Sequence, residues 1–429
     1  MSTRATDDDY LVPRRQAHCV LGLLFLLMVF DFIDRQVLAS LLPAIKLEWS
    51  LSDRQLGMLV SAVNVAIAIL ALPVAVVVDR WSRTRAIGIM AVFWSLATAA
   101  CMLAGNFTQM LVARFAIGTG EAGYVAGGNA LLSALYPARL RGTVIGIFQS
   151  ATMIGTVAGV VLGGVIAAHW GWRAAFGVVA IPGLVLAVLM FFVKDYKTVA
   201  VTVRDEASGA VREVSWLGVL GMIVSKPVLL VLFLGQAAQL FFVATFSNWL
   251  PSFFNRFHGL PLDKAGIRTG LTLIVAAVGV ALGGWVIDRI AGTRLQRRLF
   301  GAAALAFITA AFFISAFRME EASPLQSALM FGGAFFMLTV LGPVMAAVTD
   351  LVHPGMRTSA LGMMITFTNL FGMGLGPTLT GMLSDQYDLR IALLIVSFMP
   401  VLAGFGYLLA GLGYERGRVS AIEVRLSAA

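Results

Sequence analysis

The sequence predicts a polytopic α-helical membrane protein, and its composition and long apolar runs are the main evidence. Of the 429 residues, 59% are hydrophobic and only 12% are charged, which is far too apolar for an ordinary soluble domain. Apolar runs long enough to cross about 30 Å of hydrocarbon as helices recur along the whole chain. Short segments of alternating polarity, the pattern of a membrane β-barrel, do not occur in the sequence.

Twelve apolar segments are predicted to span the membrane, giving twelve transmembrane helices. The first follows Arg14 and Arg15 and has no small-residue cleavage site, so we expect an uncleaved helix and not a signal peptide. The predicted spans are 19–42, 53–78, 86–104, 107–132, 141–167, 172–193, 227–250, 266–287, 297–317, 324–348, 357–383 and 389–413.

The distribution of basic residues predicts that both termini are cytoplasmic. With that orientation, 21 of the 31 lysine and arginine residues lie in inside segments, in keeping with the positive-inside rule. The net charge of +9 then reflects cytoplasmic loops that rest on anionic lipid. No basic stripe with interleaved aromatic residues indicates a nucleic-acid partner.

The longest polar connection divides the predicted helices into two groups of six. We expect a cytoplasmic linker at 194–226 between two six-helix halves. The predicted organisation is a cytoplasmic N-terminal tail at 1–18, an N-terminal half at 19–193, the linker, a C-terminal half at 227–413 and a cytoplasmic C-terminal tail at 414–429.

Repeated motifs indicate that the two halves arose by duplication. Asp79-Arg80 follows the second span and Asp288-Arg289 follows the eighth, 209 residues later. Arg141 and Arg357 open the fifth and eleventh spans with a similar offset, each followed five residues later by glycine. Internal repeats around a midplane site are typical of secondary transporters, which rock one half against the other.

Five ionisable residues lie inside predicted spans, where a charge is costly. Asp31, Asp34 and Arg35 fall within an arc of roughly 100° on one face of the first helix. Arg114 and Glu121 lie on nearly the same stripe of the fourth helix, about 10 Å apart along its axis. Because intramembrane charges usually mark ion or substrate paths, these residues are the candidate functional site.

The motifs resemble those of the major facilitator superfamily, and within it of the Spinster family, including its bacterial members. The Asp-Arg loops are similar to the superfamily's G-x-x-x-D-R-x-G-[RK]-[RK] motif, and Arg114-x-x-x-Gly118 is similar to its R-x-x-x-G element. The Spinster motifs N-x-x-D-R and G-x-G-E-A-S-Y are matched by Asp31-Phe-Ile-Asp34-Arg35 and Gly118-Thr-Gly120-Glu121-Ala-Gly123-Tyr124. Asp31 stands where the family usually has Asn, and bacterial anion:cation symporters share the Asp-Arg and R-x-x-x-G-x-x-E patterns.

The resemblance implies the major facilitator fold, with two pseudo-symmetric halves and helices one and four lining a central cavity. In that arrangement three acids face two bases, so we expect a proton to be the coupling ion. The predicted proton-coupling residues are Asp34, Arg35, Arg114 and Glu121. Asp31 either pairs with Arg35 within the helix or contacts substrate. A static network that clamps the two helices is the structural alternative.

Other predicted site residues lie in the second half and in the cytoplasmic loops. Amide and hydroxyl side chains among many phenylalanines suit an amphipathic substrate. The predicted substrate-binding residues are Asp31, Gln236, Gln239, Asn248, Thr366, Phe367 and Asn369. The resemblance implies a cytoplasmic gate at Asp79, Arg80, Arg83, Asp288 and Arg289, although helix capping and positive-inside charge would also explain these residues.

The sequence therefore predicts a proton-coupled secondary active transporter with alternating access, moving a lysolipid-like or sphingoid-like amphipath. The alternative is an organic-anion:proton symporter for a small carboxylate or sugar acid. No zinc-binding H-E-x-x-H, nucleophile turn or phosphate loop occurs, so an enzyme or primary pump is disfavoured, and no cofactor or metal is expected. The expected location is the bacterial inner (plasma) membrane, and by resemblance the expected state is a monomer.

Overall fold

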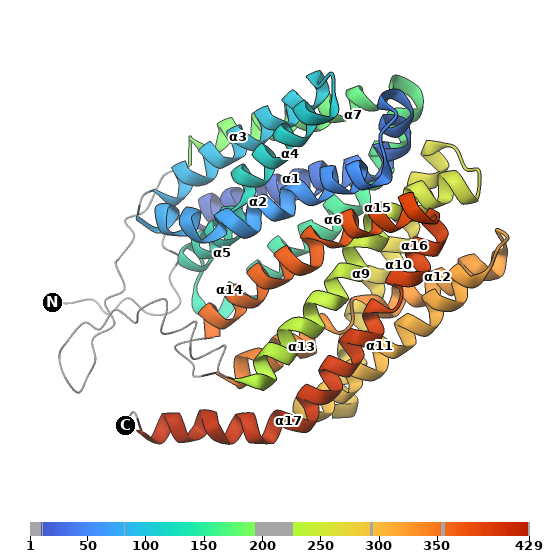
Figure 1. Cartoon of the computed structure of the whole chain (residues 1–429). Coiled ribbons are helices and arrows are strands. Elements are labelled where there is room, and N and C mark those ends of the chain that lie inside the picture. The colour runs from blue at the N-terminus through green and yellow to red at the C-terminus, as the bar shows by residue number, and fades with distance from the viewer. Residues whose placement is uncertain are drawn as a thin grey trace. The chain divides into compact units, whose positions relative to one another are not determined.

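The chain folds into helices throughout the part that the computed structural model describes, which is residues 10, 12–80, 82–193, 226–291, 295–352 and 357–427 (Figure 1). No strand occurs in those ranges. The predicted linker at 194–226 lies outside them except for Lys226, and so does most of the predicted N-terminal tail.

Before the linker, helices follow one another with very short connections. They are α1 (Arg14–Trp49), α2 (Asp53–Arg80), α3 (Arg83–Leu103), α4 (Phe107–Glu121), α5 (Tyr124–Leu135), α6 (Ala138–Trp170) and α7 (Trp172–Met190). Side chains cap several of their starts: Ser82 accepts a hydrogen bond from the Arg85 amide at α3, and Asn106 accepts one from the Gln109 amide at α4. Such caps satisfy amide groups that have no partner within the helix.

After the linker the helices are longer or are divided into shorter pieces. They are α9 (Pro227–Phe257), α10 (Leu262–Ala291), α11 (Leu295–Arg318), α12 (Pro324–Met337), α13 (Leu341–Asp350), α14 (Arg357–Thr368), a π-helical segment (Asn369–Gly374), α15 (Gly376–Gln386), α16 (Leu389–Val396) and α17 (Met399–Ser427).

Ten helical segments of the described residues are long and apolar enough to cross a membrane. The predicted spans at 107–132 and 357–383 are not among the ten. The first breaks between α4 and α5, and the second passes through the π-helical segment. The count of twelve spans and the cytoplasmic placement of both termini therefore stay predictions.

The chain forms two compact units, and several helices contribute to both. The first unit contains residues 1–196, 244–274 and 374–393, and the second contains 197–243, 275–373 and 394–429. The end of α9 and the start of α10 thus belong to the first unit together with α1–α7. The two compact units therefore do not coincide with the two predicted halves, 19–193 and 227–413.

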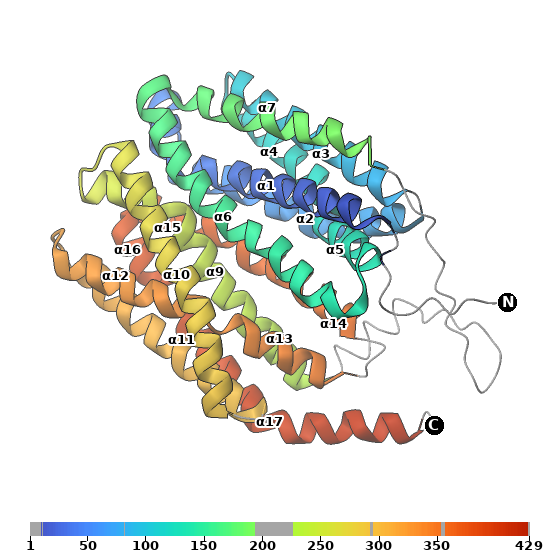
Figure 2. The ribbon, with the colours of Figure 1, turned by 180° about the vertical axis from the view of Figure 1, so that it is seen from behind.

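Within the first unit, α1 packs closely along α6 (Figure 2). A stripe of three glycines on α6 allows this approach. A Cβ atom on Gly155, Gly159 or Gly163 would lie 2.5, 2.7 or 2.8 Å from the carbonyl oxygens of Val29, Ile33 and Val37. Small residues at such spacing let the backbones of membrane helices pack closely.

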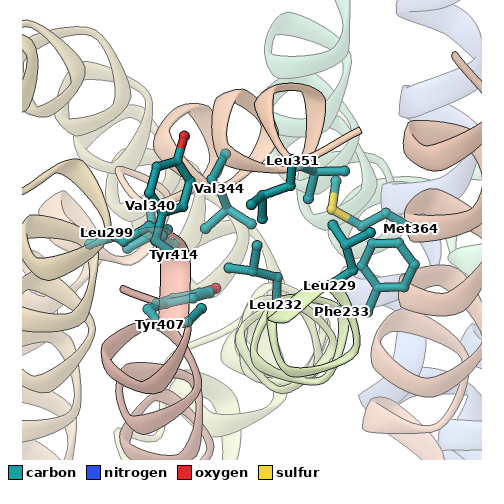
Figure 3. Packing of buried hydrophobic residues seen from close by; sticks show 14 of the residues in the cluster. Leu229, Leu232, Phe233, Leu299, Val340, Val344, Leu351, Met364, Tyr407 and Tyr414 are labelled. Carbon is teal, nitrogen blue, oxygen red and sulfur yellow. The ribbon is translucent and has the colours of Figure 1, made fainter. Parts of the chain in front are cut away.

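The second unit has its own apolar core, in which α9 packs against α13 and α17 (Figure 3). Leu229, Leu232 and Phe233 of α9 are almost fully buried there. On α17, Tyr407 and Tyr414 point aromatic rings into the same cluster, and the Tyr414 hydroxyl donates to Asp350. Their polar atoms are thus satisfied at the edge of the apolar contact.

The glycine stripe on α6 makes a prediction about stability. Gly159→Ala should destabilise the protein by about 1 to 3 kcal/mol, because the new methyl group overlaps the Ile33 backbone. Gly146→Ala on the same helix is the matched control, since nothing lies within 4 Å of its Cβ position. There the higher helix propensity of alanine should leave stability unchanged or improve it. Thermal unfolding of both variants in detergent measures the difference, and equal effects would contradict the packing role.

Candidate functional site

The structure brings the five predicted intramembrane ionisable residues together inside the first unit. Asp31, Asp34 and Arg35 come from α1, and Arg114 and Glu121 from α4. The four residues other than Arg35 are at most 2% exposed, and the Arg35 side chain is 17% exposed. Charges so deeply buried require partners, and the described contacts divide them into two groups.

The first group places one guanidinium between two carboxylates. Arg35 Nε lies 3.1 Å from Asp31 Oδ1 and 2.9 Å from Glu121 Oε2. A second Arg35 nitrogen donates to Asp31 Oδ2 at 3.4 Å. Arg35 therefore makes both an intrahelical pair, as the i,i+4 spacing predicted, and a bridge from α1 to α4. We name Asp31, Arg35 and Glu121 the Arg35 group.

The second group pairs one guanidinium with one carboxylate. Arg114 NH1 lies 3.7 Å from Asp34 Oδ1 and donates to the Asp34 backbone carbonyl at 3.2 Å. Thr98 of α3 donates its hydroxyl to Asp34 Oδ2 at 2.5 Å. Asp34 thus connects α1 to both α3 and α4. We name Asp34, Arg114 and Thr98 the Arg114 group.

The charge surplus falls in one group only. The Arg114 group has one acid and one base, whereas the Arg35 group has two acids and one base. Among the described residues, no group donates a hydrogen bond of good geometry to either Glu121 oxygen, although Arg35 lies at ion-pair distance. No described group donates such a hydrogen bond to Asp34 Oδ1 either, although Arg114 lies 3.7 Å from it. Buried acceptors that are incompletely satisfied are rare in folded proteins, so these oxygens are candidates for a functional role.

Glycines and a tyrosine in the fourth-span motif set how the chain around Glu121 packs against neighbouring helices. A Cβ atom on Gly118 would lie 2.3 Å from the Val63 carbonyl oxygen, and one on Gly120 would lie 2.9 Å from the Trp94 amide nitrogen. These glycines allow α4 to lie directly against α2 and α3. Glu121 then ends α4, and after the break the Tyr124 hydroxyl donates to the Leu24 carbonyl of α1 at 2.6 Å.

The predicted substrate-binding residues of the second half lie in both units. Asn248 is in the first unit and donates to the Ala244 carbonyl of its own helix. In the second unit, the Gln236 side chain accepts a hydrogen bond from Tyr407, and Gln239 donates to the Met337 carbonyl. Gln239 is fully buried, and no described group donates to its Oε1.

The remaining predicted substrate-binding residues lie near the division of the eleventh span. Thr366 and Phe367 are in the last part of α14, and Asn369 begins the π-helical segment. All three are partly buried. Phe367 contacts the rings of Phe233 and Phe371, with centroids 6.2 and 4.6 Å away. A π-helical segment often occurs at a functional position.

The predicted cytoplasmic gate residues lie only partly within the described residues. Asp79, Arg80 and Asp288 fall on helices, but their side chains lie outside the description. Arg83 begins α3 and is partly buried, whereas Arg289 is exposed near the end of α10. Their role as a gate stays a prediction.

Two elements of the structure were not predicted from the sequence. Thr98 lies 64 residues from Asp34 and carries no local signal beyond its place in an apolar span. A second ionic cluster forms around Asp53, which binds Arg256 located 203 residues further along the chain. Nothing local in the sequence marks that pairing, because each residue lies at a predicted helix end, where charges are common.

Comparison with known proteins identifies the superfamily. Residues 24–377 match the model of the Major Facilitator Superfamily. The hexuronate transporter of Bacillus subtilis is 27% identical over 374 residues, covering 86% of this chain and 88% of the relative. Protein spinster homolog 1 of Xenopus laevis is 24% identical over 446 residues, covering 96% of this chain and 83% of the relative.

The fold agrees with this family match. A crystal structure of a bacterial homolog to the human lysosomal transporter Spinster, in an inward-facing and unoccupied conformation, has a TM-score of 0.84. It is 22% identical, and the similarity covers 95% of this chain and 99% of that one. The resemblance inferred from the motifs is thereby confirmed, and the chain is a multi-pass membrane protein that belongs to the Major Facilitator Superfamily.

Proposed function

We propose that the protein is a proton-coupled secondary active transporter of the bacterial inner membrane, working as a monomer. In this proposal it moves an amphipathic small molecule, lysolipid-like or sphingoid-like, by alternating access. The observation that carries the proposal is the buried set of three carboxylates and two guanidiniums shared by α1 and α4. Transport, and not catalysis, is the general activity of the superfamily.

The Arg35 group supplies the reason for a proton. It holds two carboxylates and one guanidinium, all buried or nearly so, and a proton is the smallest species that can neutralise the surplus acid. Protonation of Glu121 would remove the charge that binds Arg35 to α4, while Asp31 would keep Arg35 on α1. Proton binding would in this way weaken a bridge between two helices, which is what a coupled conformational change requires.

The Arg114 group supplies the second proposed proton-coupling residue. Asp34 is held by Arg114 and Thr98, so protonation there would weaken its attraction to α4 without breaking the backbone contact of Arg114. We assign Asp34 and Glu121 jointly as the proton-binding residues, one in each group, and treat them as a coupled pair. Arg35 and Arg114 are their proposed counter-ions.

Several relatives support the amphipathic substrate. The Arabidopsis thaliana relative named probable sphingolipid transporter spinster homolog 1 is 25% identical over 443 residues. We propose that the polar head of the substrate meets the acid-rich Arg35 group. The second unit, taken by itself, offers apolar surface with polar groups: Gln239 has a buried oxygen to which no described group donates, and Phe367 lies among other rings.

A second candidate substrate is a small organic acid taken up with a proton. The hexuronate transporter of Bacillus subtilis and a probable L-galactonate transporter of Escherichia coli are both similar over most of their lengths. In this version, protonation of Asp34 or Glu121 would release a guanidinium. The released arginine would bind the substrate carboxylate, for which its planar fork is well suited.

The proton hypothesis is tested by variants that should lose uptake driven by a pH gradient but keep substrate exchange. Purified protein in liposomes with an imposed pH gradient should accumulate substrate. Asp34→Asn and Glu121→Gln should abolish that accumulation but retain exchange of labelled substrate at equal pH. Glu48→Gln is the matched control, since this α1 acid pairs with Trp172 and Arg173 away from the site. Wild-type gradient-driven uptake by both site variants would refute the proposal.

A double-mutant cycle tests the buried pair. Arg114→Gln should lower the free energy of unfolding by about 3 to 5 kcal/mol, because it leaves the Asp34 carboxylate buried without a counter-ion. Adding Asp34→Asn should recover more than about 1 kcal/mol of that loss. The Arg173 and Glu48 pair, with both side chains 41% exposed, is the control and should show a coupling energy below about 1 kcal/mol. Equal coupling energies for the two pairs would contradict the arrangement described.

Thermal stabilisation of the purified protein distinguishes the two candidate substrates. A sphingoid base or lysolipid should raise the unfolding temperature, and shortening its alkyl chain should abolish the effect. Stabilisation by hexuronates or aldonates that lack any alkyl chain would instead favour the organic-acid transporter. Hits from either group are then tested for uptake in liposomes.

A further inference from the structure

A cavity of about 440 Å³ lies within the first unit, at the ends of α1, α9 and α15 and the start of α16. The topology predicted from the sequence puts these helix ends on the outer side of the membrane. Three basic residues line the cavity, Lys46, Arg256 and Arg390, and two acids, Asp53 and Asp388. We name this feature the outer cavity. It is not part of either ionic group described above.

Asp53 accepts hydrogen bonds from three other lining residues. Arg256 donates to both of its carboxylate oxygens, at 2.7 and 2.8 Å, in a bidentate pair. Lys46 Nζ and the Ser384 hydroxyl each donate at 2.5 Å. Asp53 is therefore fully engaged as an acceptor, with two cations for one carboxylate.

Asp53 is much less exposed to solvent than the two basic residues that bind it. The Asp53 side chain is only 4% exposed, whereas Lys46 is 34% and Arg256 is 27% exposed. Asp53 uses one of the three N–H groups of Lys46 and two of the five of Arg256. The other lining acid, Asp388, is exposed, so the lining as a whole carries three basic residues and two acids, and Lys46 and Arg256 keep N–H groups that Asp53 does not use and that another anion could bind.

Aromatic side chains form another part of the wall. Phe253 and Phe257 stack one helical turn apart, with ring centroids 5.0 Å apart and planes 19° apart. Tyr387 is 62% exposed at the same cavity. Cationic donors beside aromatic rings suit a ligand that carries a carboxylate or phosphate on an apolar or sugar-like body.

Asp53 also fixes the start of α2 against α15. The two Asp385 carboxylate oxygens accept hydrogen bonds from the backbone amides of Asp53 and Arg54, at 2.7 and 2.8 Å. A Cβ atom on Gly381 would lie 2.2 Å from the Asp53 carbonyl oxygen. A change in the partners of the Asp53 carboxylate would consequently alter the contact between α2 and α15.

We infer that the outer cavity is an anion-binding vestibule, in which a ligand carboxylate or phosphate competes with Asp53 for Lys46 and Arg256. An anion bound there would loosen the Asp53 connection as it occupied the same donors. The inference rests on the proposed transport function, since a vestibule serves a substrate that enters or leaves by this side. It adds an acidic group to the chemistry expected of that substrate.

Calorimetric titration of the purified full-length protein tests the vestibule without any gradient or transport. The probes are D-glucuronate, with D-glucose as its uncharged counterpart, and a lysophosphatidate below its micelle concentration. Lys46→Gln should weaken binding of the acidic probe by about tenfold, as expected for loss of one hydrogen bond between charged groups. Arg54→Gln is the matched control: it begins the same helix, is exposed and does not line the cavity, so it should change affinity less than about twofold.

Asp53→Asn should change the affinity for the acidic probe in the opposite direction. This result distinguishes a binding site from an ion pair with a structural role only. Removal of the competing carboxylate should strengthen binding of the acidic probe by at least about threefold. Binding of glucuronate alone would identify a small acid as the ligand, and binding of lysophosphatidate alone would identify a lipid head group. If Lys46→Gln and Arg54→Gln bind both probes with the affinity of the native protein, the inference is overturned, while uptake in liposomes still decides the proposed function independently.

Discussion

The cost of placing charge inside a membrane protein governs the part of this chain that contains the candidate site. Five ionisable side chains lie buried between α1 and α4, and each needs a partner because an isolated buried charge is prohibitively expensive. Arg35 has one partner on its own helix and one on α4, and Asp34 has partners on α3 and α4, so these side chains connect α1 to α3 and α4. Glycines at 118 and 120 are part of the same constraint, because only a residue without a side chain allows α4 to come so close to α2 and α3.

The two ionic groups differ in a way that gives them different proposed roles. The Arg114 group has one acid and one base, and Thr98 fixes Asp34 further, so it has the composition of a structural ion pair. The Arg35 group has one acid too many and a cation that is partly exposed. In the proposed cycle the surplus acid binds a proton, and the weakened Glu121–Arg35 bridge transmits the response.

The Asp53 cluster uses similar chemistry at helix ends. There one buried carboxylate holds Arg256 and Lys46, and Asp385 caps the start of α2 through its backbone amides. Lys46 and Arg256 are more exposed than Asp53, and Asp388 is a second, exposed acid in the same lining. The first unit thus contains an acid-rich set of charges between α1 and α4 and, at helix ends, a cavity lined by three basic residues and two acids.

The sequence by itself determined the helical membrane architecture, the superfamily motifs and the identity of all five buried ionisable residues. This was possible because the length of an apolar segment and a charged residue inside it can both be recognised within a single span. Tertiary structure alone decided that Arg35 also binds Glu121, that Thr98 binds Asp34, and that Asp53 binds Arg256. Those pairings join residues from 64 to 203 positions apart, or choose among several nearby acids, and depend on how closely backbones approach. The division of the spans at 107–132 and 357–383 was likewise invisible in the apolar pattern, because a break in a helix leaves its hydrophobicity unchanged.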